Sequence, residues 1–416
     1  MPFGQQAVDW QERIDVNRLR RERKEKAREA AKEHGLDALL LFHGDNVRYV
    51  AMRGGVHLFM TASGYRYTLF PVDGEPILYE VGMRKPWTED SAPWLDVEYA
   101  VPVMSYLQHN SPPGVFQNQV DKFVDQIASE AADHGVETIG LDVGRPQIQA
   151  GLEDEGFDVT TEGARAMTEA RTIKTEDEIN CLRMTASVVE SIIAKFVDTI
   201  EPGVTELDLR GLATKTAYEH GADWGSAPNI NSGPNSAPVA VQASDRMLRH
   251  GDLICAALCN MAYNGYRSCY YRTFSVGEPT EAQEEAYQVA YDTLYDAIDL
   301  IEPGVTTAEL AEKFLPASEL GRPNEDSGTL MQWGHGIGLG LYEPPMVNRI
   351  WSLDYPVELE ENMTIALETH YQTDETEPLY PRGQGVRIEE MIRVTENGAE
   401  LLSKWPVEEI TSVPVN

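Results

Sequence analysis

Residues 200–205 read IEPGVT, and the same six letters return at residues 301–306. Both copies follow a stretch with a helical pattern and precede another, at residues 206–220 and 307–315. A Pro-Gly turn and a Thr N-cap are common enough for a chance match, but the matched helices favour a duplication. The period is far longer than the roughly 20–50 residues of a solenoid unit. We therefore expect two related halves that face each other.

Strand patterns lie between and after the two copies, at residues 253–258, 263–274, 363–369 and 385–394. With the long helical stretches they predict an α+β domain that has helices against one face of its strands.

The first third of the chain alternates strands and helices. We expect helices at residues 16–34 and 116–134, strands at 36–42, 66–71, 76–80 and 138–141, and a loop rich in Pro, Ser and Asn at 107–114. A long amphipathic helix is expected from around residues 168–178 to about residue 200. These patterns predict an α/β domain at residues 1–170 and the α+β domain at residues 171–416.

The chain carries 68 acidic and 34 basic residues, which gives a formal charge of -34 over 416 residues. A nucleic-acid binder needs a basic face, so the charge excludes this class. Only ten of the basic residues are lysines. An acid-rich, lysine-poor surface suits high salt, where screening weakens the self-repulsion of a large net charge. We expect a halophilic protein.

Hydrophobic residues make up 42% of the chain, which is typical of a globular protein. No apolar run approaches the roughly 18–20 residues of a membrane span, and the N-terminus shows no signal-peptide pattern. We therefore expect a cytoplasmic protein without a membrane partner. Of four cysteines, Cys255, Cys259 and Cys269 lie within fifteen residues, which indicates a local chemical role rather than a disulfide scaffold.

Three segments place acidic and imidazole groups on strands or glycine-rich turns. GHGIGLGLYEPP at residues 334–345 carries His335 and Glu343, and TIALE at 364–368 is an apolar run closed by Glu368. In GVRIEEMI at 385–392, side chains alternate, so Arg387 and Glu389 share one face. A glutamate pair beside a histidine can hold a divalent metal or divide acid and base roles between two carboxylates. Each residue alone has an ordinary structural interpretation, but together the three segments indicate a site.

These motifs, with RTIKTEDEI, NGYRSCYYRTF and VTENGAELL, resemble the pita-bread family of creatinase, prolidase, aminopeptidase P and methionine aminopeptidase. The resemblance covers residues 170–410. It implies an α+β pita-bread C-terminal domain with an internal pseudo-two-fold duplication, and an α/β N-terminal creatinase-like domain. LDALLLFHGDNVRYV and DYPVELEENMTI resemble most closely the dimethylsulfoniopropionate lyase branch. The resemblance also implies a homodimer whose N-terminal domain lends a residue to the neighbour's site, for which Arg53 is our candidate.

The family's metal site takes two aspartates from the central hairpin, one histidine and two glutamates. His335, Glu368 and Glu389 match the last three. The second aspartate falls on Cys269, and the first on Ala257, with Cys259 two residues further on.

Three further positions depart from the family pattern. Leu341 stands where the lyase branch has an aspartate, and Tyr342 stands in the place of the peptidases' second histidine. No histidine occurs at residues 221–249, the stretch around Ala240 in which peptidases and creatinase carry a catalytic one. A standard proline peptidase mechanism is therefore not expected.

Three interpretations follow. In the first, Cys259 and Cys269 replace the aspartates, and these thiolates favour one zinc or iron ion over manganese or magnesium. In the second, the site is metal-free as in creatinase, Glu368, Glu389 and His335 bind substrate and shuttle protons, and tyrosines form a wall for a cationic solute. These are Tyr263, Tyr266, Tyr270, Tyr271 and Tyr342. In the third, the fold is inactive and binds a partner.

We predict a hydrolase that cleaves a C–N bond in a small amide, amidino or proline-type substrate. Elimination from an onium compound by a lyase is the alternative, and a binding protein is the third possibility. The predicted catalytic residues are His335, Glu368, Glu389 and Cys269. The predicted substrate contacts are Tyr266, Tyr271, Tyr342, Glu343 and Arg53. The predicted ligands of a zinc or iron ion are His335, Glu368, Glu389, Cys269 and Cys259.

Overall fold

The computed structural model describes residues 14–51, 65–103, 107–225, 228–237, 241–319, 323–327, 332–373 and 383–414. These residues form two compact units, Asp15–Arg171 and Thr172–Asn416, the latter with Ile14. Domains 1–170 and 171–416 as independently folding parts stay a prediction.

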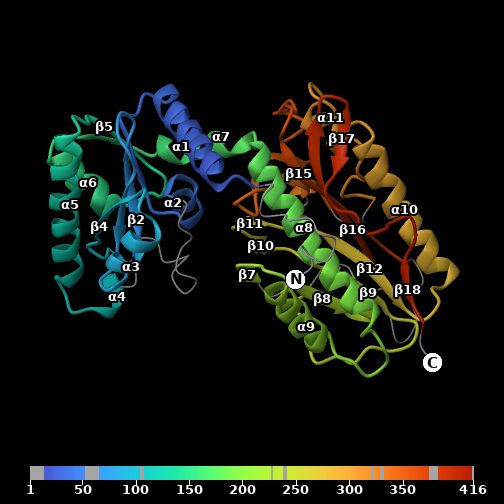
Figure 1. Cartoon of the computed structure of the whole chain (residues 1–416). Coiled ribbons are helices and arrows are strands. Elements are labelled where there is room, and N and C mark those ends of the chain that lie inside the picture. The colour runs from blue at the N-terminus through green and yellow to red at the C-terminus, as the bar shows by residue number, and fades with distance from the viewer. Residues whose placement is uncertain are drawn as a thin grey trace. The chain divides into compact units, whose positions relative to one another are not determined.

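The unit Asp15–Arg171 is built on a six-stranded sheet of order β4-β3-β2-β1-β5-β6, in which β1 runs parallel to β5 and antiparallel to β2. The strands are β1 (Ala38–Leu41), β2 (Tyr67–Pro71), β3 (Ile77–Glu80), β4 (Asp96–Tyr99), β5 (Thr138–Leu141) and β6 (Asp158–Thr160). The helices are α1 (Val16–Glu33), α2 (Gly44–Ala51), α3 (Arg84–Ser91), α4 (Leu107–Asn110), α5 (Val115–Asp133), α6 (Pro146–Asp154) and α7 (Glu162–Thr172). In Figure 1, α5 and α6 lie side by side along the sheet. The predicted strands and the helices at 16–34 and 116–134 are confirmed.

One local prediction was wrong. The loop expected at residues 107–114 begins with the short helix α4, a single turn that is too brief to show a helical period. The long helix expected to start around residues 168–178 is confirmed as α8 (Glu176–Val197), which follows the separate helix α7. The amide of Lys174 donates to the carbonyl of Asn362, and Thr175 starts α8 with a capping box to Glu178. The T-x-x-E spacing at 175–178 is the sequence signal for this new start.

The unit Thr172–Asn416 contains three sheets (Figure 1). A five-stranded sheet has the order β14-β13-β15-β16-β17, a four-stranded sheet β18-β12-β9-β8, and a small sheet β11-β10-β7. The strands of the first sheet are β13 (Gln332–Gly336), β14 (Glu343–Asn348), β15 (Thr364–Gln372), β16 (Gly385–Thr395) and β17 (Gly398–Leu401). Those of the other two are β7 (Trp224–Gly225), β8 (Asn229–Ser232), β9 (Leu253–Ala257), β10 (Met261–Tyr263), β11 (Tyr266–Arg267), β12 (Tyr271–Val276) and β18 (Thr411–Val413).

Helices cover the sheets through apolar contacts. Helix α10 (Glu281–Ile298) packs on β15 and β16, with Leu294, Leu367 and Ile388 in one buried cluster. Helix α8 packs on α9 (Glu206–Glu219) and on β10 and β11. The larger sheets meet where the hydroxyl of Thr273 on β12 donates to the carbonyl of Arg387 on β16 and accepts from the amide of the same residue. The predicted α+β character of this part is confirmed.

The two IEPGVT copies have matching environments. Thr205 and Thr306 are N-caps with capping boxes, at the starts of α9 and of α11 (Thr307–Ala311). The amides of Gly203 and Gly304 donate to the carbonyls of Leu248 and Leu359, whose amides donate back to Val204 and Val305. The repeated sequence therefore makes the same local structure twice, as expected of duplicated halves.

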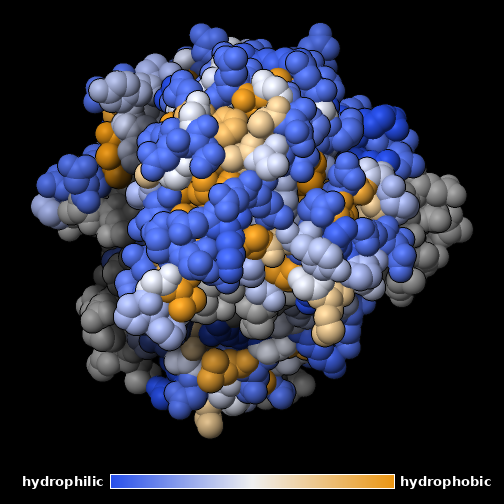
Figure 2. Space-filling view, turned by 90° about the vertical axis from the view of Figure 1, so that its left-hand side faces the viewer, coloured by the Kyte–Doolittle hydropathy of each residue, from blue (hydrophilic) through white to orange (hydrophobic). Residues whose placement is uncertain are grey.

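The surface fits the acidic composition. The face in Figure 2 is mostly hydrophilic, and its apolar residues form separate small patches. In the part of the chain that the structure describes, no helix combines the length and the apolar character of a membrane span.

Candidate metal centre

Three of the predicted site residues lie on adjacent strands. Glu368 on β15 and Glu389 on β16 are direct partners in the antiparallel ladder. His335 on β13 is paired with Ala366 of β15, two residues from Glu368. Side chains that are opposite each other, or two apart, share a face of a sheet, so the register brings the three residues to one face.

The imidazole of His335 has one nitrogen occupied and one available. Nδ1 lies 3.0 Å from the carbonyl oxygen of Gly336, and a carbonyl can only accept, so Nδ1 carries the proton. Nε2 therefore presents its lone pair. It lies 3.9 Å from Oε1 of Glu389, and both atoms are buried without a hydrogen-bond partner among the described residues. Burial lowers the pKa of His335 to about 4, which keeps the ring neutral.

Glycines shape the turn that presents His335. A Cβ at Gly336 would lie 2.0 Å from the carbonyl oxygen of Pro344, and a Cβ at Gly338 would lie 2.5 Å from Oε2 of Glu343. The contact at Gly336 is with backbone and leaves no room for a side chain, whereas the contact at Gly338 is with the end of the Glu343 side chain, which would have to move. The repeated glycines of the GHGIGLGL motif thus allow the backbone to pass close to its own next strand.

Two thiols complete the cluster. The Sγ atoms of Cys259 and Cys269 lie 2.8 Å apart, and Sγ of Cys259 lies 4.0 Å from Oε2 of Glu389. One ligand atom from each of these three residues falls within 4.8 Å of the others. Ala257, where the resemblance puts the first aspartate, is opposite Tyr271 on the ladder. Of the two candidate positions, it is Cys259 that lies against Cys269.

The donor set fits a divalent metal. Burial raises the pKa of Cys269 and of Glu389 well above their ordinary values, and raises the pKa of Glu368 to about 7. Buried groups of this kind cost free energy unless they are paired or bind a metal. Two thiols, an imidazole lone pair and a carboxylate are donors that zinc accepts. The unpartnered atoms of His335 and Glu389 lie 3.9 Å from each other.

Two of the predicted tyrosines lie at this cluster. The ring of Tyr342 lies 4.5 Å from that of His335, centroid to centroid, with 53% of the residue exposed. Burial raises the pKa of Tyr271 well above its ordinary value, with smaller contributions from Cys259 and Glu368. These residues can form a polar aromatic wall beside the site. Tyr266 is placed elsewhere: its buried hydroxyl donates to Glu178 on α8.

Glu343 has the contacts of a turn anchor. Its carboxylate lies 3.0 Å from the ammonium of Lys174, and both side chains are 1% exposed. It also accepts from the amide of Gly340. Its predicted role as a substrate contact stays a prediction that these contacts do not favour. Arg53 and Ala240 lie outside the described residues.

Arg387 was missed as a site residue. Its guanidinium lies 5.8 Å from the ring centre of Tyr271, and its positive charge opposes the effect of burial on the pKa of Glu368. The sequence signal was present, since alternation along β16 puts Arg387 and Glu389 on one face.

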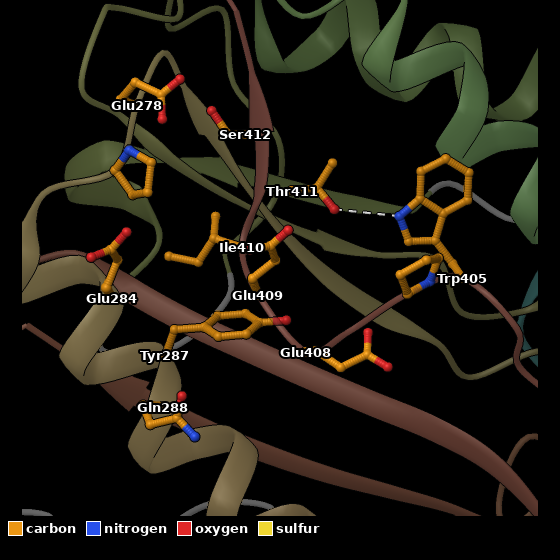
Figure 3. A pocket seen from close by; sticks show the side chains of 12 residues that line it. Glu278, Glu284, Tyr287, Gln288, Trp405, Glu408, Glu409, Ile410, Thr411 and Ser412 are labelled. Carbon is orange, nitrogen blue, oxygen red and sulfur yellow. Dashed lines mark hydrogen bonds between the residues drawn. The ribbon is translucent and has the colours of Figure 1, made fainter.

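A separate surface pocket of about 740 Å³ lies between the start of α10 and the C-terminal segment (Figure 3). Four glutamates line it together with Tyr287 and Trp405: Glu278, Glu284, Glu408 and Glu409. It contains none of the predicted site residues, so the site and this pocket are distinct features.

Comparisons with known proteins show which sequences this chain resembles. The model of metallopeptidase family M24 matches residues 180–396. The Xaa-Pro dipeptidase of Pyrococcus furiosus is 32% identical over 241 residues, which are 56% of this chain and 64% of that enzyme, just under two thirds of its length. The dimethylsulfoniopropionate lyase DddP of Roseobacter denitrificans is 23% identical over 406 residues, 94% of this chain and 87% of the relative.

Solved structures share the fold. The Xaa-Pro dipeptidase from Bacillus anthracis superposes with a TM-score of 0.72 at 22% identity, covering 94% of this chain and 99% of that one. The predicted fold class, a pita-bread C-terminal domain with an α/β N-terminal domain, is confirmed.

Proposed function

The chain belongs to metallopeptidase family M24, and we propose that it hydrolyses a C–N bond of a small polar substrate at a metal centre held by His335, Glu389, Cys259 and Cys269. The observation that carries this proposal is the pair of buried atoms Nε2 of His335 and Oε1 of Glu389, which lie 3.9 Å apart and lack hydrogen-bond partners within the described ranges. Such atoms are costly unless something occupies the space between them. The other oxygen of Glu389 lies 4.0 Å from Sγ of Cys259.

The chemistry of the donors favours a soft or borderline metal. Thiolate and imidazole ligands select zinc or iron(II) over manganese or magnesium, which prefer oxygen ligands. A divalent metal held there would act as a Lewis acid toward the scissile carbonyl. We therefore propose one zinc or iron ion per chain.

Glu368 is the proposed proton carrier. It is directly opposite Glu389 on the ladder and, like His335, lies outside the group formed by Cys259, Cys269 and Glu389. Burial raises its pKa to about 7, which suits a group that takes up and gives away a proton. From this position its carboxylate would take a proton from the attacking water and give it to the leaving amine. Arg387 and Tyr271 lie near Glu368 and would orient its carboxylate.

The proposed substrate is a dipeptide-sized amide with an N-terminal residue followed by proline. The named relative acts as an Xaa-Pro dipeptidase, which supports a peptide C–N bond as the point of cleavage. The site lacks the family's catalytic histidine after SGPNS, so this chain would rely on Glu368 alone for proton transfer. A homodimer in the cytoplasm, at high salt, remains the expected setting.

Metal analysis and hydrolysis assays test this proposal together. Purified protein should contain about one zinc or iron per chain, lose it in Cys269→Ser, and keep it in the matched control Cys181→Ser. Glu368→Gln should keep the metal and lose roughly 10²–10⁴-fold in kcat on an Xaa-Pro dipeptide. Full activity in metal-free protein, or an unchanged metal content in Cys269→Ser, would overturn the metal centre.

The lyase is a second candidate, because the match to the dimethylsulfoniopropionate lyase spans 94% of this chain. Tyr271 and Tyr342 could contact an onium group through their ring faces. Release of acrylate from dimethylsulfoniopropionate, with no hydrolysis of dipeptides, would select this candidate. A metal-loaded protein inactive on both substrates would leave the binding interpretation.

A further inference from the structure

Cys259 and Cys269 form a cross-strand pair. The ladder between β9 and β12 ends at the pair Ala257 and Tyr271. Two backbone hydrogen bonds join the chain segments just beyond it: the amide of Leu258 donates to the carbonyl of Tyr270, and the amide of Asn260 donates to the carbonyl of Ser268. Cys259 and Cys269 lie between these two hydrogen bonds, on facing segments just beyond the ends of β9 and β12.

This position suits a disulfide. Residues that face each other on neighbouring antiparallel segments have Cα atoms about 4.5–5.5 Å apart, which is within the roughly 4.4–6.8 Å that disulfides span. The two Sγ atoms already lie 2.8 Å apart as free thiols. The ring closed by such a bond would enclose a short hairpin, and short rings gain little stability from cross-linking. A bond there would be easy to form and easy to reduce.

We propose that Cys259 and Cys269 form a reversible disulfide that closes the metal centre when low-molecular-weight disulfides oxidise the metal-free protein. The competition with metal rests on the proposed function, whereas the disulfide itself rests on the geometry of the pair.

The exposure of the two residues sets the order of steps. Cys259 is partly exposed, whereas Cys269 is 2% exposed. The sulfur of Cys259 attacks the small disulfide, forms a mixed disulfide and releases one small thiol. The sulfur of Cys269 then attacks Sγ of Cys259 and releases the second small thiol. Two protein thiols are oxidised, one small disulfide is reduced, and both protons leave on the small thiols.

Closure would remove half of the proposed donor set. Sγ of Cys259 lies 4.0 Å from Oε2 of Glu389, so both sulfurs belong to the same cluster as the carboxylate. A sulfur in a disulfide is no longer a thiolate ligand. The oxidised site would keep His335 and Glu389, which are fewer than the three protein ligands that a catalytic zinc site has. Bound zinc would in turn hold both thiolates and block oxidation.

Intact-mass measurement tests the inference on the full chain. Metal-free wild-type protein treated with oxidised glutathione should lose the mass of two hydrogens, and peptide mapping should link Cys259 to Cys269. Cys269→Ser should stop at one glutathione adduct on Cys259, and Cys259→Ser should remain unmodified at the buried thiol. Cys181→Ser, a control outside the pair, should close as the wild type does.

Added zinc and added reductant complete the test. Protein preloaded with zinc chloride should keep both thiols, and dithiothreitol should restore zinc binding to the oxidised form. Stable glutathione adducts on wild-type Cys259, with no link to Cys269, would overturn the inference. A disulfide in protein that never binds zinc would refute the metal centre and leave the disulfide standing. Zinc binding by a protein whose two thiols never link would refute the disulfide and leave the metal centre standing.

Discussion

Glu389 and Glu390 are neighbours on β16, both buried, and their carboxylates have opposite situations. Glu390 receives the guanidinium of Arg272 at 2.8 Å and the hydroxyls of Tyr295 and Ser403. Glu389 has an oxygen with no hydrogen-bond partner in the described part of the chain, facing Nε2 of His335. The same side chain thus serves the core on one face of the strand and a site on the other. Saturation of hydrogen bonds, rather than burial, separates the two roles.

The strongest test of this comparison removes Arg272, the cation that pairs with Glu390. Arg272→Met should lower the free energy of unfolding by about 3–5 kcal/mol, because it leaves a buried carboxylate without its cation. Denaturant unfolding measures this loss. The control is Arg183→Met, because Arg183 meets Glu400 at the same 2.8 Å but both side chains are partly exposed. That change should cost about 0–1 kcal/mol, and equal losses would contradict the comparison.

Exchange of each glutamate for glutamine separates metal binding from stability. Glu389→Gln should weaken zinc binding by at least about 100-fold, because a ligand is lost. The metal-free form should unfold within about 1 kcal/mol of wild type, since a neutral amide is less costly to bury than a charge. Glu390→Gln should leave zinc binding unchanged and lower the free energy of unfolding. Competition with a chromogenic chelator and denaturant unfolding give the two readouts, and equal metal affinities in both variants would refute the assignment.

The proposed site has sulfur ligands, Cys259 and Cys269, as well as the carboxylate ligand Glu389. Restoring oxygen donors with Cys259→Asp and Cys269→Asp together should lower the zinc-to-manganese affinity ratio by about tenfold, because carboxylates suit harder ions. The ratio can be measured by equilibrium dialysis with both metals. Cys255→Ser is the control, since that thiol donates to the carbonyl of Gly385 instead. An unchanged ratio in the double variant would show that the cysteines are not ligands.

The smallest expected effect concerns the N-cap threonines of the two IEPGVT copies. Thr205→Ala and Thr306→Ala each remove an N-cap from one IEPGVT copy and should each cost about 1 kcal/mol. Thermal unfolding should give similar losses for both, and zinc binding should not change. A loss confined to one copy would argue against equivalent halves.

The sequence predicted the fold well because its signals were local and repeated. The IEPGVT copies contain both the turn and the cap, so duplication could be inferred without any tertiary contact. Helix α7 was not predicted, and its separation from α8 has a non-local cause. The break at Lys174 depends on a hydrogen bond to Asn362, nearly two hundred residues away in the chain.

The candidate site was predicted as a set of residues but not as an arrangement. Alternation on β16 indicated that Glu389 faces a site, yet only the ladder shows that Cys259, rather than Ala257, lies against Cys269. Tyr266 and Glu343 looked like site residues because polar groups on strands and turns look alike in sequence. Their partners, Glu178 and Lys174, come from a distant helix and from the segment before it.

The buried pair of Lys174 and Glu343 also decides where the chain can be shortened. Helix α8 begins at Glu176, which looks like a natural first residue for a minimal catalytic fragment. Such a fragment would discard the ammonium that holds the turn behind His335, as well as the bridge between Ile173 and Met363. A fragment that begins at Thr172 would retain both links. Residues 172–174 therefore belong to the structure that supports the candidate site, although their sequence resembles a linker.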